Sequence, residues 1–542
     1  MKQIISILSL FIGLNITAQK NNPQIIVGIV IDQMCYDYLY RFQKNYSKKG
    51  FNEIMKNGTN CRNVEYNYIP TYTGPGHASI YSGTTPNNHG IVANNWYERN
   101  SKQLVNCVGD LSFQSVGTDS DYGKCSPNRM KSFTVTDQLK LTYPDSKVIS
   151  LSIKDRGAIL PGGHKSDGSY WFDYQSGKFI TSSYFRSKLP EWLTSFNENK
   201  NCFTYAKRWI PILEEQDYSS EDKSDYEVIL SGKTNSQFPY DIEKLMSINN
   251  NLSAFTVSPF ANTLLTDLAI EAIQNEDLGE GEKTDMICIS YSSTDIAGHA
   301  FGPYSKEIED MYIRLDHDIS RLIKFLNKKY GKKGYVLFMT ADHGVVPVPK
   351  QLSDLNLPGG YVFVDSLEQK LKEKSKLAFG ADLIEKNINL NIYLNHERID
   401  SLQIDIKDVE SFIKNELIRI NGVKNVLSAD LFSNFRSTDD KYETLVIKGF
   451  DSKRSGDLLI ILEPGYLPET STDPNLNKGT SHGSGYAYDT HVPLLWYGSG
   501  IKKQEIFRPI EITDIAPTLT HILNIQRTGG MTGNPIVEIL EK

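Results

Sequence analysis

The chain has 542 residues, of which 39% are hydrophobic and 23% charged, and its formal net charge is −7. This length suits one large enzyme core with insertions, or two to three domains, because a domain usually has about 100–200 residues. The composition argues against wholesale disorder, and the negative charge argues against nucleic-acid binding, which usually needs a basic surface.

A targeting segment is predicted at the N-terminus. Lys2 precedes an apolar run at residues 4–14, which is shorter than the roughly 20 residues that a membrane-spanning helix needs. The small residues Thr17 and Ala18 follow in a cleavage-site pattern. We therefore expect residues 1–18 to be a signal peptide and the mature chain to be periplasmic or secreted. No later apolar run is long enough to predict a membrane span.

Six short apolar runs predict the strands of a buried sheet. Each is continuously apolar rather than alternating, as is typical of strands covered on both faces. Helical patterns lie between them, for example at residues 308–326. Strands that alternate with helices predict an α/β fold with a doubly wound, mostly parallel sheet flanked by helices. The six runs are residues 25–31, 148–153, 286–291, 335–339, 458–462 and 492–497.

Two stretches break this alternation and are expected to be cap insertions in a single catalytic domain at residues 19–542. They lie at about residues 160–250 and 355–450. The first is rich in Tyr, Trp, Ser and Asn, and the second has short strand and helix signals of its own. A closing helix is predicted at residues 512–523.

The six cysteines form no Cys-x-x-Cys pair, which disfavours a cysteine-built zinc site. Because an exported chain meets an oxidising environment, we expect Cys107 and Cys125 to form a disulfide. Cys288 lies in an apolar run and is expected to be a buried thiol.

Acidic and histidine side chains follow three of the predicted strands. Asp32 follows the first strand, Asp295 and His299 the third, and Asp342 and His343 the fourth. Ligands of doubly wound sheets bind beyond the carboxyl ends of the strands, and Zn²⁺ readily binds imidazole nitrogen and carboxylate oxygen. An Asp at a strand end is often only a helix N-cap. The prediction of a metal site therefore depends on the coincidence of three strand ends.

Thr73 is the candidate nucleophile. It precedes Gly-Pro-Gly, and a helix is predicted to begin near Pro75. A hydroxyl at a helix N-terminus lies among free N–H groups that can bind a phosphate, and a bound metal would ionise it. Taken alone, Thr73 would be interpreted as an N-cap residue.

Several segments together carry a family resemblance. They are Asp32, PTYTGPGH at 70–77, GTTPNNHGI at 83–91, NNWY at 94–97, SIKDRGAILPGG at 152–163, STDIAGH at 293–299, TADHG at 340–344 and SHGSGYAYDTHVP at 481–493. In these segments the chain resembles the alkaline phosphatase superfamily, most closely the exported, threonine-nucleophile bacterial alkaline phosphatases of the PafA type. It is more distantly similar to the nucleotide pyrophosphatase/phosphodiesterases. The segments run in family order over nearly the whole mature chain.

The resemblance implies two Zn²⁺ ions and a phosphothreonine intermediate on Thr73. The implied ligands are Asp32, Thr73, Asp342 and His343 for one ion, and Asp295, His299 and a late histidine for the other. Both His482 and His491 lie in the matching segment. We favour His482 because it lies between a Gly-Thr-Ser turn and Gly483, where a loop ligand is expected.

Lys154 and Arg156 follow the strand predicted at residues 148–153. Two nearby cations often belong only to a solvated loop. The resemblance implies instead that they contact the phosphoryl oxygens, with Asn94 as a neutral donor. A monoester carries one more negative oxygen than a diester, so this pair favours phosphate monoesters.

The sequence therefore predicts an exported, monomeric alkaline phosphatase acting on diverse small-molecule phosphate monoesters. One alternative is a phosphodiesterase or nucleotide pyrophosphatase with the same two zinc ions. An alternative of another class is a non-catalytic exported protein that binds glycans or nucleotides. Cys125 also begins a sequence that resembles the sulfatase signature, but it lies about 50 residues after Thr73, and Asn128 replaces the expected Ser or Ala.

Overall fold

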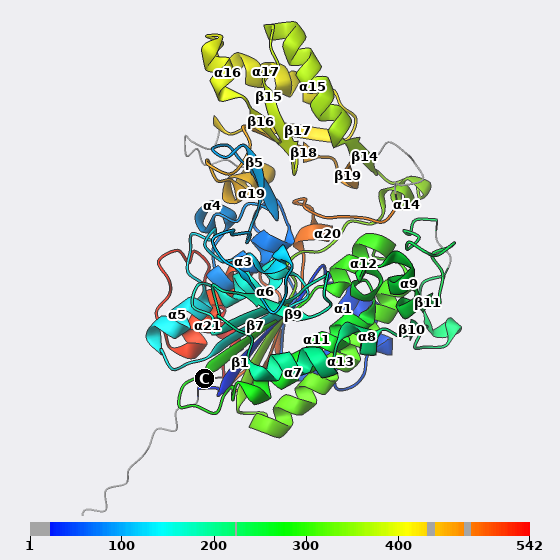
Figure 1. Ribbon diagram of the computed structural model, residues 1–542, viewed down its shortest axis with the longest axis vertical. Coiled ribbons are helices and arrows are strands. Elements are labelled where there is room, and N and C mark those ends of the chain that lie inside the picture. Colours follow the sequence, from blue (N-terminus) through cyan, green and yellow to red (C-terminus); the bar gives the residue numbers. More distant parts are fainter. Residues whose placement is uncertain (1–21, 223–224, 431–439, 471–477, 542) are drawn as a thin grey trace, which may run out of the picture.

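The largest element of the fold is a ten-stranded sheet (Figure 1). The structure, a computed structural model, describes residues 22–222, 225–430, 440–470 and 478–541, so the expected signal peptide lies outside the described residues. In spatial order the strands are β21 (Gln504–Ile506), β2 (Thr59–Cys61), β20 (Leu494–Gly498), β13 (Tyr335–Thr340), β1 (Ile25–Ile31), β12 (Asp285–Tyr291), β7 (Val148–Ser152), β8 (Gly168–Phe172), β9 (Phe179–Ser182) and β6 (Ser115–Val116).

The centre of this sheet is parallel. β1 pairs in parallel with β12 and with β13, and the parallel order continues through β7 to β8. Antiparallel pairing enters on both sides, where β20 joins β13 and β9 joins β8. Every residue of β1, β12 and β13 is buried, as expected for strands covered by helices on both faces. The predicted mostly parallel α/β sheet is confirmed.

Helices flank the sheet on both sides (Figure 1). α11 (Pro259–Asn275) and α13 (Lys306–Tyr330) pack against each other, and α3 (Thr73–Ser82) packs against α6 (Asp155–Gly162). The side-chain oxygen of Ser305 accepts a hydrogen bond from the Ile308 N–H and caps α13. The apolar positions that predicted α13 are all buried, namely Ile308, Met311, Leu315, Ile319, Leu322, Ile323 and Leu326.

A second, smaller sheet forms the cap lobe at the top of Figure 1. The cap lobe comprises β15 (Ile384–Ile388), β16 (Asn391–Leu394), β18 (Leu458–Leu462) and β17 (Val423–Ser428) in spatial order, with α15 (Val364–Phe379), α16 (His396–Ser401) and α17 (Ile406–Leu417). It has an apolar core of its own. The assignment of residues 458–462 to the main sheet was wrong, because this apolar run is buried in the sheet of the cap lobe.

The two stretches expected as insertions differ in how they relate to the main sheet. The stretch at about 160–250 contributes β8 and β9 to the main sheet itself, and α7 (Glu191–Asn199), α8 (Cys202–Tyr205) and α9 (Ile242–Asn249) follow. The stretch at about 355–450 supplies all of the cap lobe except β18. Among the described residues no helix combines the length and apolar character that a membrane crossing requires.

The predicted disulfide is absent from the structure. All six cysteines are free thiols, and Cys107 and Cys125 are both buried in a small apolar cluster beside Trp96 and Met130. The prediction that these two residues pair was therefore wrong. Of the sulfatase-like segment, Cys125 itself belongs to this cluster. Cys288 is a buried thiol within β12, as predicted.

Candidate active site

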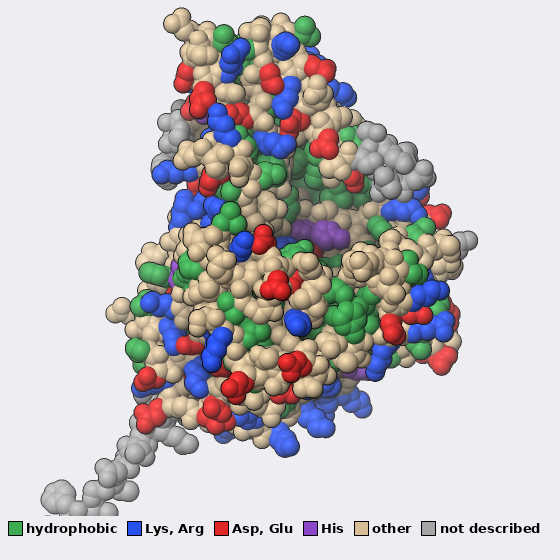
Figure 2. Space-filling view, viewed as in Figure 1, with side chains coloured by type: hydrophobic (Ala, Val, Ile, Leu, Met, Phe, Trp, Pro, Cys, Tyr) green, Lys and Arg blue, Asp and Glu red, His purple; other side chains and the backbone are tan. Residues whose placement is uncertain are grey.

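The carboxyl ends of β1, β12 and β13 bring four buried side chains together. Asp32 follows β1, Asp295 lies in the first turn of α12 (Ser293–Phe301) after β12, and Asp342 and His343 follow β13. These strands are parallel neighbours, so their ends meet at one edge of the sheet. Figure 2 shows histidine side chains in a hollow between the cap lobe and the main body.

One group of possible metal ligands consists of Asp32, Asp342 and His343, whose ligand atoms lie within 4.8 Å of one another. His343 Nε2 is 3.4 Å from Asp32 Oδ1 and 3.6 Å from Asp342 Oδ2. Asp32 Oδ1 is buried and has no hydrogen-bond partner among the described residues. Burial, together with the charges of Asp295 and Asp342, raises the pKa of Asp32 well above its ordinary value. Such a site calls for a cation.

A second group consists of Asp295, His343 and His482, again within 4.8 Å of one another. His482 Nε2 is 3.6 Å from Asp295 Oδ1, and His299 Nε2 is 3.1 Å from the same oxygen. The rings of His343 and His482 stack with centroids 3.5 Å apart. Carboxylate and imidazole donors in this arrangement fit Zn²⁺.

The three site histidines are oriented in the same way. In each of them the Nδ1–H donates to a backbone carbonyl: His299 to Thr480 at 2.8 Å, His343 to Gly344 at 3.0 Å and His482 to Thr71 at 2.7 Å. This leaves each Nε2 facing the carboxylates, which is how metal-binding histidines are held. Burial, reinforced by His343 and His299, keeps the pKa of His482 well below its ordinary value, so its Nε2 lone pair is available.

The structure distinguishes between the two late histidines. His482 belongs to the second ligand group, whereas His491 Nε2 is 3.1 Å from the carbonyl of Arg62 and its ring stacks on Tyr36. The chain near His482 is fixed to the end of β13, where the Gly344 N–H donates to the Asp489 carbonyl at 2.8 Å. A Cβ on Gly344 would lie 2.1 Å from the carbonyl oxygen of Tyr488, so only glycine allows this approach.

Thr73 is the first residue of α3 and is buried. The helix begins two residues before the predicted start, and its N-cap is Tyr72, so Thr73 is not the N-cap residue. Its Oγ1 is 3.4 Å from His343 Nε2. Gly76 lets α3 approach the chain at Asp342, because a Cβ on Gly76 would lie 2.4 Å from the Asp342 carbonyl oxygen. The hydroxyl therefore lies at a helix N-terminus beside the first ligand group.

Of the three residues expected to bind phosphate, Lys154 contacts the ligand carboxylates, Asn94 contacts the residue after Thr73, and Arg156 lies in α6, which packs against α3. Lys154 is buried, and its ammonium contacts Asp295 and lies 2.7 Å from Asp32 Oδ2. Burial disfavours its charge, but Asp295 and Asp32 outweigh this effect, and the pKa of Lys154 lies above its ordinary value. Arg156 is in the first turn of α6. Asn94 accepts a hydrogen bond from the Gly74 N–H at 2.7 Å, next to Thr73.

Two residues of the site were missed in the sequence. The Gln33 side chain donates to Asp295 Oδ1 at 2.6 Å, and its backbone N–H donates to Asp342 Oδ1 at 3.1 Å. His77 donates from Nδ1 to the carbonyl of Thr73 at 2.9 Å, and the same nitrogen is 3.3 Å from Asp342 Oδ2. The spacing of His77, four residues after Thr73 on one helix, could have identified it. No comparable signal marks Gln33.

Comparison with known proteins gives consistent matches over most of the chain. The family profile of type I phosphodiesterase / nucleotide pyrophosphatase matches residues 26–485. Alkaline phosphatase PafA of Elizabethkingia meningoseptica is 40% identical over 535 residues, 96% of each chain. Alkaline phosphatase PhoV of Synechococcus elongatus is 36% identical over 526 residues, 96% of this chain and 93% of the relative. The crystal structure of wild-type PafA matches with a TM-score of 0.91 and 38% identity, covering 96% of this chain and 99% of that one.

Proposed function

The chain belongs to the type I phosphodiesterase / nucleotide pyrophosphatase family and is an alkaline phosphatase of the PafA type, and from this premise we propose that it is an exported, zinc-dependent phosphate monoesterase of broad specificity. The observation that carries the proposal is the common orientation of three buried histidines, whose Nε2 atoms face carboxylates beside the Thr73 hydroxyl. The signal-like pattern of residues 1–18 supports export.

The proposed metal centre has two adjacent ligand groups that overlap at His343, and we assign one ion to each. When bound, zinc supplies positive charge that ionises a hydroxyl and stabilises a departing oxygen. The proposed ligands are Asp32, Thr73, Asp342 and His343 for the first ion, and Asp295, His299 and His482 for the second.

Thr73 is the proposed nucleophile. Its hydroxyl releases its proton to solvent, its Oγ1 forms a bond to phosphorus while the bond to the ester oxygen breaks on the opposite side, and the departing alcohol takes a proton from solvent. Water then attacks phosphorus, releasing inorganic phosphate and restoring the hydroxyl. The side chains of Lys154, Arg156 and Asn94 bind the phosphoryl oxygens in both steps.

A phosphodiesterase using the same site is the alternative, and the family description favours it. Two observations support a monoesterase instead. Relatives that match nearly the whole chain are named alkaline phosphatases, and Lys154 and Arg156 add two positive charges that suit a dianionic phosphate. The non-catalytic alternative lacks support, because nucleophile and ligand side chains are all present.

One experiment tests the nucleophile. Reaction with a labelled phosphate monoester, quenched in acid, should leave label on Thr73, and Thr73→Ala should abolish both label and turnover. Thr73→Ser should keep label and substantial turnover, because serine offers the same nucleophilic atom. Zinc bound by each purified protein, measured by atomic emission, gives a readout besides activity. Label on Thr71 or Ser79 would overturn the assignment. Equal rates on a monoester and a matched diester would overturn the monoesterase proposal.

A further inference from the structure

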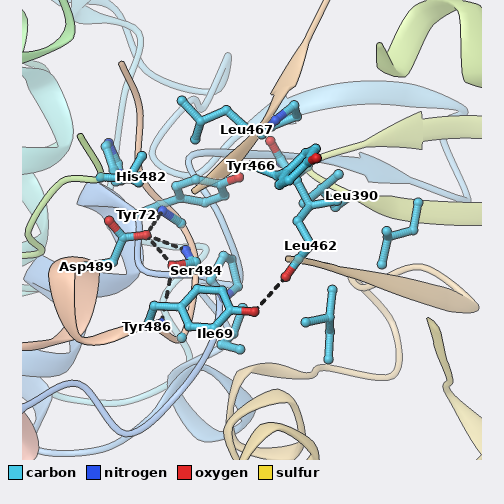
Figure 3. Close-up of a pocket in the computed structure, with 18 of the residues that line it drawn as sticks. Ile69, Tyr72, Leu390, Leu462, Tyr466, Leu467, His482, Ser484, Tyr486 and Asp489 are labelled. Atoms are coloured by element: carbon cyan, nitrogen blue, oxygen red, sulfur yellow. Dashed lines mark hydrogen bonds between the residues drawn. The ribbon is translucent and has the colours of Figure 1, made fainter. Parts of the chain in front are cut away.

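A pocket lies beside the candidate active site, between the chain that carries His482 and the cap lobe (Figure 3). One wall comes from the main body, with Ile69 and Tyr72, and the other comes from the cap side, with Leu390, Leu462, Tyr466 and Leu467. The volume of the pocket that the centres of water molecules can occupy is about 60 Å³. A single water needs roughly 10–15 Å³ on this measure, so the pocket has room for about four to six waters.

The lining of this pocket is apolar and aromatic. Among the described residues that form it there is no Lys, Arg or Glu. Its one aspartate, Asp489, is held through Oδ2, which accepts hydrogen bonds from the N–H groups of Gly483 and Ser484 and from the Ser484 hydroxyl at 2.6 Å, whereas its Oδ1 is buried and has no hydrogen-bond partner among the described residues. The pocket therefore suits an apolar or aromatic group better than a charged one.

The position of the pocket connects it with the reaction. Thr73 lies against His343 on the side of the first ligand group, and His482, which lines the pocket, stacks on that ring and belongs to the second group. In an in-line displacement the leaving oxygen departs opposite the nucleophile, and the proposed function assigns that oxygen to the second ligand group. The alcohol part of an ester whose leaving oxygen lies at the second group would be next to His482, which lines the pocket.

We propose that this pocket is the subsite for the alcohol part of the substrate, and that it selects phosphate monoesters of aromatic or other apolar alcohols over those of polyols and sugars. The inference rests on the proposed function. It assigns to the cap lobe a share in substrate choice, because half of the lining comes from that side.

Hydrogen bonds hold the two walls together. The Tyr486 hydroxyl donates to the Leu462 carbonyl at 2.8 Å, and the Gly465 N–H donates to the Tyr488 hydroxyl at 3.2 Å. These contacts fasten the end of β18 to the chain that follows His482. The subsite is thus formed before substrate arrives, which lowers the entropic cost of binding.

Leu390→Asn tests the subsite. Leu390 has a φ of 60°, a backbone conformation that Asn tolerates well, so the substitution changes polarity with little backbone strain. We expect kcat/KM for phenyl phosphate to fall about 10-fold, whereas kcat/KM for glycerol 2-phosphate should change less than about 2-fold. The matched control is Leu377→Asn, on the cap-lobe helix α15, whose leucine is 87% exposed. It should alter neither rate.

Two further measurements keep the test decisive. Inhibition by inorganic phosphate, which has no alcohol part, should be the same in the wild type and Leu390→Asn. A second variant, Leu390→Ala, should show the same selective loss to a smaller degree. Equal changes for both substrates, or none, would overturn the subsite. Failure of the wild type to hydrolyse either monoester would overturn the proposed function instead.

Discussion

At the scale of single residues, the buried charges around Lys154 decide what the site can bind. Its ammonium contacts Asp295 and Asp32, and Asp342 lies in the same ligand group as Asp32. One ammonium cannot neutralise three buried carboxylates, and a buried unpaired charge is costly. Lys154 therefore has two proposed partners, the ligand carboxylates and the phosphoryl oxygens of the substrate.

Removing the two cations should change substrate preference. Lys154→Ala and Arg156→Ala should each lower kcat/KM for a monoester. Each should cost about 2–4 kcal/mol of transition-state stabilisation, as removal of one oxyanion-hole donor does. The double variant should cost less than the sum, because both cations address one phosphoryl group. Diester hydrolysis should fall much less. Steady-state rates of the four proteins on a matched monoester and diester provide the measurement. Equal losses on both substrates would instead indicate a role in positioning the metals.

His77 should matter for metal retention. It contacts Asp342 Oδ2 and the Thr73 carbonyl, and its Nε2 accepts from the Ser290 hydroxyl at 2.8 Å. His77→Asn should weaken zinc binding about 10- to 100-fold, since residues that orient ligands have effects of this size. Competition with a chromogenic chelator measures the affinity. His491→Asn, outside the ligand groups, should leave it unchanged. Unaltered zinc affinity in His77→Asn would rule out this role.

At the scale of secondary-structure elements, the short helix α4 (Pro86–His89) depends on an uncharged histidine. His89 Nδ1 accepts from the Ile91 N–H at 3.1 Å, and its Nε2–H therefore donates to the Ser79 hydroxyl of α3 at 3.0 Å. A second proton would break the first of these bonds. Burial, with a contribution from Arg454, lowers the pKa of His89 to about 3.

This histidine predicts a loss of stability in acid. Between pH 6.5 and about 3 the unfolded chain takes up a proton that folded His89 cannot. The unfolded state binds more protons in that window, so stability falls as pH falls, by about 1.4 kcal/mol per unit well below pH 6.5. In urea unfolding at pH 7.5 and 5, His89→Gln should lose less stability than the wild type. His521→Gln, at an exposed histidine, serves as control. Equal pH dependence of all three would contradict the prediction.

The sequence was informative about strands but not about their partners. The apolar runs that became β1, β12 and β13 were placed correctly in the main sheet, and the strand-end rule then brought Asp32, Asp295 and the residues after β13 together. The run of β18 has the same composition, yet it belongs to the cap lobe. Pairing depends on contacts between segments far apart in sequence, and no pattern within one strand records them. The contact of the Gln33 side chain with Asp295 likewise joins segments far apart in sequence, so no local pattern predicts it.

At the scale of the whole molecule, the proposed metal ligands connect segments from both ends of the chain. The first group begins at Asp32 and the second ends at His482. Ions bound between them would crosslink the ends of β1, β12 and β13 to the loop before β20. Their removal would leave buried carboxylates that repel one another, so occupancy should stabilise the fold as a whole.

Chelation should therefore lower the melting temperature. A ligand that binds only the folded state stabilises it by about 4 kcal/mol at a free concentration 1,000 times its Kd. Calorimetry after EDTA treatment should show a lower Tm, which excess zinc should restore better than magnesium, because imidazole ligands suit zinc. Asp342→Asn should reduce the difference between the treated and restored protein. A Tm that neither chelator nor zinc alters would refute the crosslink.

The strand order also sets when during its synthesis the protein can become active. β20 lies between β13 and β2, both of which are made earlier, and His482 comes shortly before it in the chain. A nascent chain that has emerged only as far as residue 480 already contains Thr73 and the whole first ligand group. It still lacks His482, the last of the proposed ligands, and its sheet is open between β13 and β2. With His482 as a proposed ligand, the ribosome must deliver almost the entire polypeptide before phosphatase activity begins, so we expect an incomplete chain to have no partial activity.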